Sequence, residues 1–365
     1  MQQFHSGVSS EKITIKSRIK IKPRPVKKTK NKSLTAVKGE IRRQKDFLDQ
    51  VHAARMAVRG YNTVPVARRA TSAPKLLLKQ LAAPAAARAF NLLAQGDSWF
   101  DYPPGTDLID CLHSNHGHTI TNIAVAGSTL NDEAYGPVPR ELFGLPLGPK
   151  QSSDPDRITE LVHHIQQGSN QGAFQALLIS AGGNDIAGEP FFSFINNARS
   201  GLPQVNAPVL DGVVNGTFKA AYQYLIDTAL AAAADVKISL PIFTHGYDYP
   251  WPDGRGVIDF LGWRVGPWFD PVFNEKNYPF DSGNSNNTTS GLQTRCDIVA
   301  QFIDSMNTML AGLATDPKYA GKVFHVELRG TLQTENDWAN ELHPGNAGFS
   351  KLADKINAAL QSNIS

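Results

Sequence analysis

The feature that most constrains the fold of this chain is a series of short, continuous apolar runs separated by stretches with helical periodicity. Runs that are apolar throughout, and do not alternate with polar residues, are typical of strands buried on both faces of a sheet. Helical stretches between such strands predict parallel pairing, because a parallel neighbour is reached through a crossover helix. The five predicted strands are Phe90–Ala94, Thr119–Ala126, Ala176–Ser180, Val236–Phe243 and Val323–Leu328.

Helices are predicted at about residues 106–115, 156–168, 218–234, 294–314 and 345–361, so that they alternate with the strands. The predicted fold class is α/β: a three-layer α/β/α domain whose mostly parallel, five-stranded sheet is covered by helices on both faces. Its crossovers should be right-handed. Because ligands bind such sheets at the carboxyl ends of the strands, chemistry is expected in the residues just after each strand.

Charge divides the 365-residue chain into two unequal parts. Residues 1–90 hold 21 Lys and Arg against 4 Asp and Glu, whereas residues 91–365 hold 15 against 29. The basic arm, residues 1–45, has high charge and weak hydrophobicity, so most of it is predicted to be disordered. It is either a solvated tail or an arm that binds an anionic partner. Residues 46–89 are rich in alanine and predict a helical lead-in to a domain at 90–362.

Cysteine content and hydropathy exclude several classes of protein. With only Cys111 and Cys296, the chain is not a disulfide-stapled domain. It contains no run of about 18 apolar residues that would predict a membrane span. Its first 30 residues lack the apolar stretch of a secretion signal, so a cytoplasmic location is favoured.

Cys111 lies close in sequence to His113, His116 and His118, and this group could be interpreted as a zinc site. The spacing matches no common structural zinc motif, and no second pair of cysteines accompanies it. We therefore predict a polar loop between a helix and a strand, with no metal ligands.

Residues suited to acyl transfer follow three of the five predicted strands and precede the last helix. The first strand leads to Gly96-Asp97-Ser98, in which the glycine permits a sharp turn and the serine projects at the edge of the sheet. The second leads to Gly127, and the third to Gly182-Gly183-Asn184-Asp185. Between the last strand and the last helix lies His343, whose imidazole can accept a proton near neutral pH.

Together these residues supply a nucleophile, a base and donors for a developing oxyanion. Ser98 is the predicted nucleophile and His343 its base. The predicted donors are the backbone N–H groups of Ser98 and Gly127 and the side-chain amide of Asn184; one such donor is typically worth about 3 kcal/mol in a transition state. The pattern predicts acyl transfer through a covalent serine intermediate.

The same four blocks resemble those of the SGNH/GDSL hydrolases. The first family block, Gly-Asp-Ser with an apolar or aromatic residue next, is matched by Gly96-Asp97-Ser98-Trp99, and the second, a lone glycine, by Gly127. The third, Gly-x-Asn-Asp, is matched by Gly182-Gly183-Asn184-Asp185, and the last, Asp-x-x-His-Pro, in part by Asn340-Glu341-Leu342-His343-Pro344. The resemblance covers about residues 90–362. It implies a flavodoxin-like sheet and hydrolysis of esters or related acyl groups, without a cofactor or metal ion.

The last block departs from the family pattern, because Asn340 stands where the family has an aspartate. An asparagine oxygen can accept the Nδ1 proton of His343, but it cannot stabilise an imidazolium ion as a carboxylate does. Three alternatives follow. In the first, Asp337, which lies one helical turn before Asn340, supplies the carboxylate, with or without Asn340 beside it. In the second, a backbone carbonyl orients His343. In the third, the site is weak or inactive. Glu341 is predicted to point away from the histidine.

Residues 245–291 form an aromatic-rich insertion after the fourth strand. A long connection at the predicted active edge is expected to act as a lid or wall for the substrate, and the alternative is a segment that packs on itself or on the lead-in. Trp99, next to the nucleophile, and Tyr247 and Trp251 in the insertion are predicted to bind substrate. The predicted substrate is a small-molecule ester with an acyl, lipid or acylated-sugar group.

Two other functions are compatible with the same motifs. An acyltransferase would pass the acyl group to an alcohol acceptor. A weakly active, hydrolase-like binding protein would be docked to an anionic partner by its basic arm, and Asn340 is the residue in its favour.

Overall fold

The structure is a computed structural model, and it describes residues 88–102, 105–138, 141–142, 145–146, 155–258, 264–279 and 288–364. The predicted basic arm, 1–45, lies outside the described residues, as does the lead-in at 46–89 except for its last two positions. Residues 259–263 and 280–287 of the insertion are likewise not described.

Five parallel strands form the central sheet, in the order β2-β1-β5-β6-β9. Numbered along the chain within this sheet, the order is 2-1-3-4-5, which is the flavodoxin-like arrangement. The predicted fold class is confirmed. The strands are β1 (Asn91–Gly96), β2 (Thr119–Asn122), β5 (Ala176–Ser180), β6 (Ile242–Thr244) and β9 (Val323–His325).

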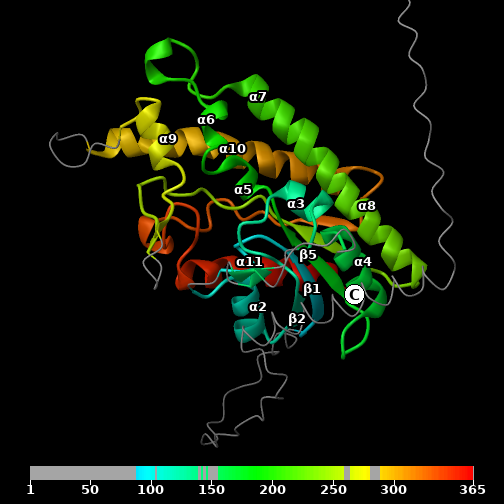
Figure 1. Cartoon of the computed structure of the whole chain (residues 1–365). Helices are drawn as coiled ribbons and strands as arrows, with labels where there is room; N and C mark the ends of the chain where they lie inside the picture. Colours follow the sequence, from blue (N-terminus) through cyan, green and yellow to red (C-terminus); the bar gives the residue numbers. More distant parts are fainter. Residues whose placement is uncertain are drawn as a thin grey trace, which may run out of the picture. The chain divides into compact units, whose positions relative to one another are not determined.

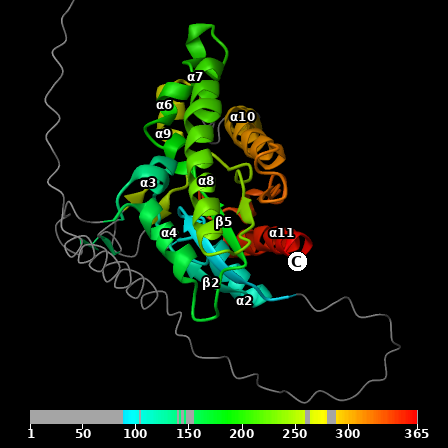
Figure 2. The same cartoon turned by 90° about the vertical axis from the view of Figure 1, so that its right-hand side faces the viewer.

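Helices cover both faces of this sheet (Figures 1 and 2). On one face, α2 (Leu108–His116) contacts α11 (Asn346–Asn363). On the other, α4 (Arg157–Gln167) contacts both α3 (Leu130–Tyr135) and α8 (Lys219–Asp235), and α10 (Thr288–Thr315) packs beside α8. Among the described residues, no helix combines the length and the hydropathy needed to cross a bilayer.

Shorter elements connect these layers. The short helices are α5 (Gly183–Ile186), α6 (Phe191–Phe194), α7 (Ala207–Asp211) and α9 (Asp270–Glu275), with 3-10 turns at Ala198–Ser200 and Glu335–Asp337 and a π-helical segment at Gly212–Phe218. Two small antiparallel hairpins pair β3 (Glu141–Leu142) with β4 (Leu145–Pro146) and β7 (Val257–Ile258) with β8 (Arg264–Val265).

Adjacent strand residues pack into two separate hydrophobic clusters, one on each face of the sheet. Leu93 and Leu177 belong to the cluster formed with α4, α8 and α10, whereas their neighbours Leu92 and Leu178 belong to the cluster formed with α2 and α11. All four side chains are buried. Burial on both faces explains why these strands are apolar at every position, without the alternation of a half-exposed strand.

Three predicted strands are longer than the observed ones; β9 ends at His325 and not at Leu328. β2 ends at Asn122 and not at Ala126, because the Asn122 side chain accepts the Ala124 N–H at 2.9 Å and donates to the Phe100 carbonyl at 2.6 Å. β6 begins at Ile242 and not at Val236. Lys237 has a left-handed φ of 59°, which interrupts an extended chain.

Candidate active site

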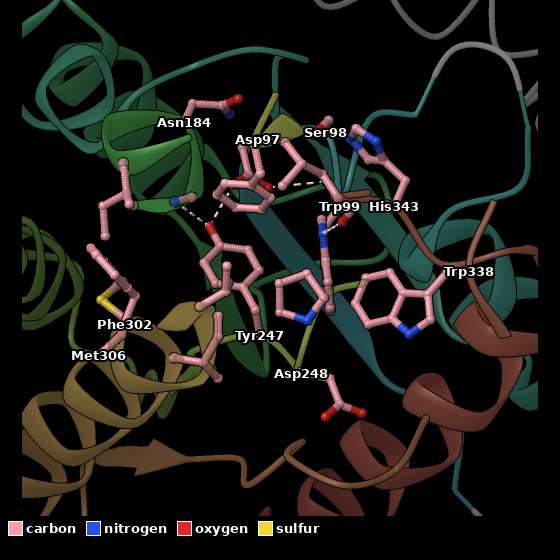
Figure 3. Close-up of a pocket in the computed structure, with 18 residues that line it drawn as sticks. Asp97, Ser98, Trp99, Asn184, Tyr247, Asp248, Phe302, Met306, Trp338 and His343 are labelled. Carbon is pink, nitrogen blue, oxygen red and sulfur yellow. Dashed lines mark hydrogen bonds between the residues drawn. The ribbon is translucent and has the colours of Figure 1, made fainter. Parts of the chain in front are cut away.

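Ser98 lies in the turn that follows β1, at the carboxyl end of the sheet (Figure 3). Gly96 permits this turn, since a Cβ atom there would lie 2.8 Å from the carbonyl oxygen of Ser180 on the neighbouring strand β5. Asp97 and Trp99 on either side are buried, whereas Ser98 itself is only half-buried. The hydroxyl of Ser98 is therefore the group that this turn presents to a ligand.

One ring nitrogen of His343 faces the Ser98 hydroxyl, and the other faces the side chain of Asn340. Its Nε2 lies 2.7 Å from Ser98 Oγ, and its Nδ1 lies 3.0 Å from Asn340 Oδ1. The same Asn340 oxygen accepts the backbone N–H groups of Leu342 and His343, at 3.0 and 2.9 Å. Because these two donors identify the atom as the amide oxygen, the ring proton must sit on Nδ1. Nε2 is then the nitrogen that accepts the Ser98 proton.

Asn340 thus occupies the place beside His343 for which the sequence left three alternatives. The Asp337 carboxylate is engaged elsewhere: it pairs with Lys351 at 2.6 Å and accepts the backbone N–H groups of Gln333 and Thr334. Within the described part of the chain, the group bonded to Nδ1 is the Asn340 amide, and neither the Asp337 carboxylate nor a backbone carbonyl takes that place.

Aromatic rings enclose His343. Tyr102 stacks on the imidazole with a centroid separation of 4.4 Å, and its hydroxyl accepts the Asn340 side-chain N–H at 3.0 Å. Trp268 of the insertion meets the imidazole edge-on, with centroids 5.5 Å apart. Burial lowers the pKa of His343 to about 3, since no neighbouring carboxylate compensates for the lost hydration of the imidazolium. The ring is therefore neutral, and competent as a base, at neutral pH.

The three predicted oxyanion donors follow three adjacent strands, β1, β2 and β5, and Asn184 lies in the short helix α5. The Asn184 amide donates to the carbonyl of Ser128 at 2.9 Å, which ties it to the Gly127 turn and leaves its second hydrogen for a ligand. In the described chain no acceptor is bonded to the N–H of Ser98 or of Gly127. Gly127 has a left-handed φ of 80°, which favours glycine at this position.

Asp97 connects the nucleophile turn to the turn that carries Asn184. Its buried carboxylate accepts hydrogen bonds from the Tyr247 hydroxyl at 2.6 Å, the Ser180 hydroxyl at 2.9 Å and the Trp99 N–H at 3.0 Å. Burial raises the pKa of Asp97 to about 6, against the opposite effect of these hydrogen bonds. The Tyr247 hydroxyl in turn accepts the N–H of Gly183 at 3.0 Å.

No protein-family model matches the sequence, and no curated protein matches it significantly. Several solved structures are similar to it. The lipase Lip_vut3 from a goat rumen metagenome is 10% identical with a TM-score of 0.42, covering 74% of this chain and 97% of that chain. A putative SGNH hydrolase from Slackia heliotrinireducens is 11% identical with a TM-score of 0.39, covering 75% and 100%. The Clostridium thermocellum family 3 carbohydrate esterase is 16% identical with a TM-score of 0.34, covering 75% and 100%.

This chain resembles the SGNH/GDSL hydrolases. The resemblance rests on the four motif blocks and on the way the fold brings their residues together: Ser98 with His343 and Asn340, and Asn184 on the neighbouring turn.

The aromatic residues predicted to bind substrate occupy different positions. Trp99 and Tyr247 line the pocket beside Ser98, but both are buried. The Trp99 Nε1–H donates to the Leu342 carbonyl at 3.0 Å, and the Tyr247 hydroxyl is occupied by Asp97 and Gly183. Trp251 packs beside the cluster of α2 and α11 and is not one of the residues that line this pocket.

Glu341 points away from His343, as predicted, and binds the insertion. Its carboxylate, fully buried, accepts the backbone N–H groups of Gly254 at 3.0 Å, Trp268 at 2.6 Å, Phe269 at 2.7 Å and Asp270 at 3.1 Å. All four donors belong to the insertion. The residue next to Asn340 therefore fastens the insertion, including Trp268, to the loop that carries His343.

The pocket beside Ser98 is lined mainly by apolar side chains from α10, α5 and the insertion (Figure 3). The cavity has a volume of about 60 Å³, and the open space including the mouth is about 640 Å³. The sequence predicted the helix α10 but not its role in lining this pocket. Hydrophobic periodicity identifies the buried face of a helix and does not show which cavity that face borders. The apolar lining consists of Ile186, Pro250, Phe269, Val299, Phe302, Ile303, Met306 and Leu342.

The histidines near Cys111 act in packing. His118 Nδ1 accepts the Phe90 N–H at 3.0 Å, and its Nε2 lies 3.1 Å from Asn357 Oδ1 on α11. His113 Nδ1 lies 2.8 Å from the His118 carbonyl oxygen, and His116 pairs with Asp354 at 3.0 Å. In the region that the structure describes, no three His, Cys, Asp or Glu side chains are grouped to hold a metal ion.

Proposed function

We propose that this protein is a serine ester hydrolase that works through an acyl-enzyme on Ser98. The observation that carries the proposal is the contact of 2.7 Å between Ser98 Oγ and His343 Nε2, with the Nδ1 proton held by Asn340. A hydroxyl becomes a strong nucleophile when a positioned base removes its proton during attack.

In the acylation step, Ser98 Oγ attacks the ester carbonyl carbon while its proton passes to His343 Nε2. The carbonyl oxygen becomes an oxyanion, for which Ser98 N–H, Gly127 N–H and the second hydrogen of Asn184 are the candidate donors. When the tetrahedral intermediate collapses, the bond to the leaving oxygen breaks and His343 gives that oxygen its proton. The products are a free alcohol and an ester of Ser98.

In the deacylation step, water takes the place of the alcohol. His343 Nε2 removes a proton from the water as its oxygen attacks the acyl carbon, and then returns a proton to Ser98 Oγ. The carboxylic acid leaves and the enzyme is regenerated. During both steps His343 carries a positive charge, and Asn340 orients the ring without neutralising that charge.

The test is covalent labelling with a fluorophosphonate, combined with hydrolysis of nitrophenyl esters. We expect the wild type to be labelled once and Ser98→Ala not at all, with a loss of at least about 10³-fold in kcat. Equal labelling of wild type and Ser98→Ala would contradict the proposal.

The same experiment separates the rival functions. An acyltransferase would be labelled too, but with an added alcohol it would form more transferred ester than free acid. A binding protein with a non-functional site would show neither labelling nor turnover, and its partner binding would depend on residues 1–45, which the structure does not describe.

A further inference from the structure

We propose that the apolar pocket beside Ser98 binds the acyl chain of the substrate, so that the enzyme prefers esters of acyl groups with several carbons over acetyl esters. This inference rests on the proposed serine chemistry and goes beyond it, because it assigns one part of the ester to one cavity.

The position of His343 decides which part of the ester enters the pocket. His343 must deliver its proton to the leaving oxygen, so the alcohol part of the substrate lies on the His343 side of Ser98. In Figure 3, Phe302 and Met306 lie on the opposite side of the pocket from His343. An acyl chain attached to the carbon that Ser98 attacks would therefore extend toward α10, away from the leaving group.

The chemistry of the lining favours hydrocarbon over a sugar. Two carboxylates border the pocket, but both are occupied: Asp97 by Tyr247, Ser180 and Trp99, and Asp248 by the backbone N–H groups of Tyr249, Gly330 and Leu332. The remaining lining toward α10 is apolar. Sugar hydroxyls placed there would lose their hydrogen bonds to water and find few replacements, whereas methylene groups are stabilised by burial.

Met306 limits the space in this pocket. Its methyl carbon lies 2.8 Å from the position that a Cβ atom would take on Gly182, in the turn that leads to Asn184. The side chain is buried and lines the pocket. Removing it should therefore lengthen the space available to an acyl chain.

The experiment measures kcat/KM for nitrophenyl esters from acetyl to dodecanoyl. We expect kcat/KM to rise about fourfold per added methylene over the first few carbons, as expected for burial of a CH2 group, and then to level off or fall. A wild type that hydrolyses the acetyl ester at least as well as the butanoyl and hexanoyl esters would overturn the acyl-chain assignment.

Two variants on α10 form a matched pair. Met306→Ala should move the optimum to longer chains. Met309→Ala, at a residue equally buried on the same helix but packed in the core and not lining the pocket, should leave the optimum where it is. Val299→Phe should narrow the pocket and move the optimum to shorter chains. Equal shifts in Met306→Ala and Met309→Ala, or no shift in Met306→Ala and Val299→Phe, would overturn the proposal.

The outcomes also separate this inference from the proposed function. If the wild type is labelled by a fluorophosphonate but prefers acetyl esters, only the acyl-chain assignment fails. If it is not labelled and hydrolyses no ester in the panel, the serine chemistry fails and the assignment fails with it.

Discussion

At the scale of single residues, Asn340 orients His343, and burial sets the acidity of the imidazole. Its amide oxygen accepts the ring proton and two backbone N–H groups, so the tautomer is defined without a carboxylate. Burial of the imidazole, with no carboxylate beside it, lowers the pKa of His343 to about 3. A base with such a low pKa stays unprotonated in moderately acidic solution, but it accepts the serine proton less readily.

We therefore predict that Asn340→Asp changes the pH dependence of ester hydrolysis. A carboxylate beside Nδ1 stabilises the imidazolium, so the pKa of His343 should rise. Since only neutral His343 acts as the base, the acid limb of kcat/KM should move to higher pH, and kcat at pH 8 should increase by about tenfold or more. The measurement is a pH profile of nitrophenyl ester hydrolysis from pH 4 to 9.

Asp337→Asn is the control for this prediction. The Asp337 carboxylate pairs with Lys351 and does not contact the imidazole, so its removal should leave the position of the acid limb unchanged. A profile that moves with Asp337→Asn and not with Asn340→Asp would show that the charge acting on His343 has been assigned to the wrong residue.

At the scale of elements, the Glu341 carboxylate joins the insertion to the loop that carries His343. It does this by accepting backbone N–H groups of the insertion. Glu341→Gln replaces one carboxylate oxygen by an NH₂ group that faces two N–H donors. We expect a loss of about 3 kcal/mol in the free energy of unfolding, the cost of leaving buried hydrogen bonds unsatisfied. Because Phe269 and Trp268 are among the residues released, KM for long-chain esters should also rise, by about tenfold.

Urea unfolding and the chain-length panel measure these two effects. Glu341→Asp keeps the carboxyl group and should recover part of both. Ile165→Ala, a buried core change on α4, should lower stability by a similar amount through its cavity without raising KM. If Ile165→Ala raised KM as much as Glu341→Gln, the effect of Glu341 would be general destabilisation and not release of the insertion.

The elements also show what could be predicted from the sequence and why. The helices α4, α8 and α11 were predicted to within two residues, whereas α10 begins six residues before its predicted start. β5 was predicted at its observed bounds, because burial on both faces leaves an uninterrupted apolar run. The short helices α5, α6 and α9 were not, since four to six residues are too few to show a period. The ends of β6 were misplaced because backbone conformation at Lys237 leaves no signal in composition.

The candidate site was predictable to a similar extent. Ser98, Asn184 and His343 were candidates because each stands in a motif at a strand end or before a helix, and the fold brings Ser98 and His343 within hydrogen-bond distance. The partner of His343 could not be chosen among Asp337, Asn340 and a carbonyl, since the choice depends on the path of the loop between the 3-10 turn and α11. Tyr102 and Glu341 were missed as structural partners of His343 and of the insertion, because their contacts join segments far apart in the chain.

At the scale of the whole domain, the sheet separates two clusters of buried apolar side chains, one on each face. Residues of β5 alternate between them: Leu177 packs with α8 and α10, and Leu178 with α2 and α11. The site spans both sides of this division, since Ser98 and Asn184 follow central strands while His343 leads into α11 and the pocket wall comes from α10. The two faces of the sheet should therefore contribute to the free energy of unfolding through different sets of side chains.

This separation predicts additive effects of core mutations at adjacent positions. Leu177→Ala and Leu178→Ala each remove a side chain that is at most 1% exposed, and each should lower the free energy of unfolding by about 3 kcal/mol. Because the two cavities would lie on opposite faces without shared side-chain contacts, the double variant should lose the sum to within about 0.5 kcal/mol. Denaturant unfolding of the four proteins measures this. A coupling of more than about 1 kcal/mol would mean that the two cores respond to each other through the sheet, and the two-core description would have to be abandoned.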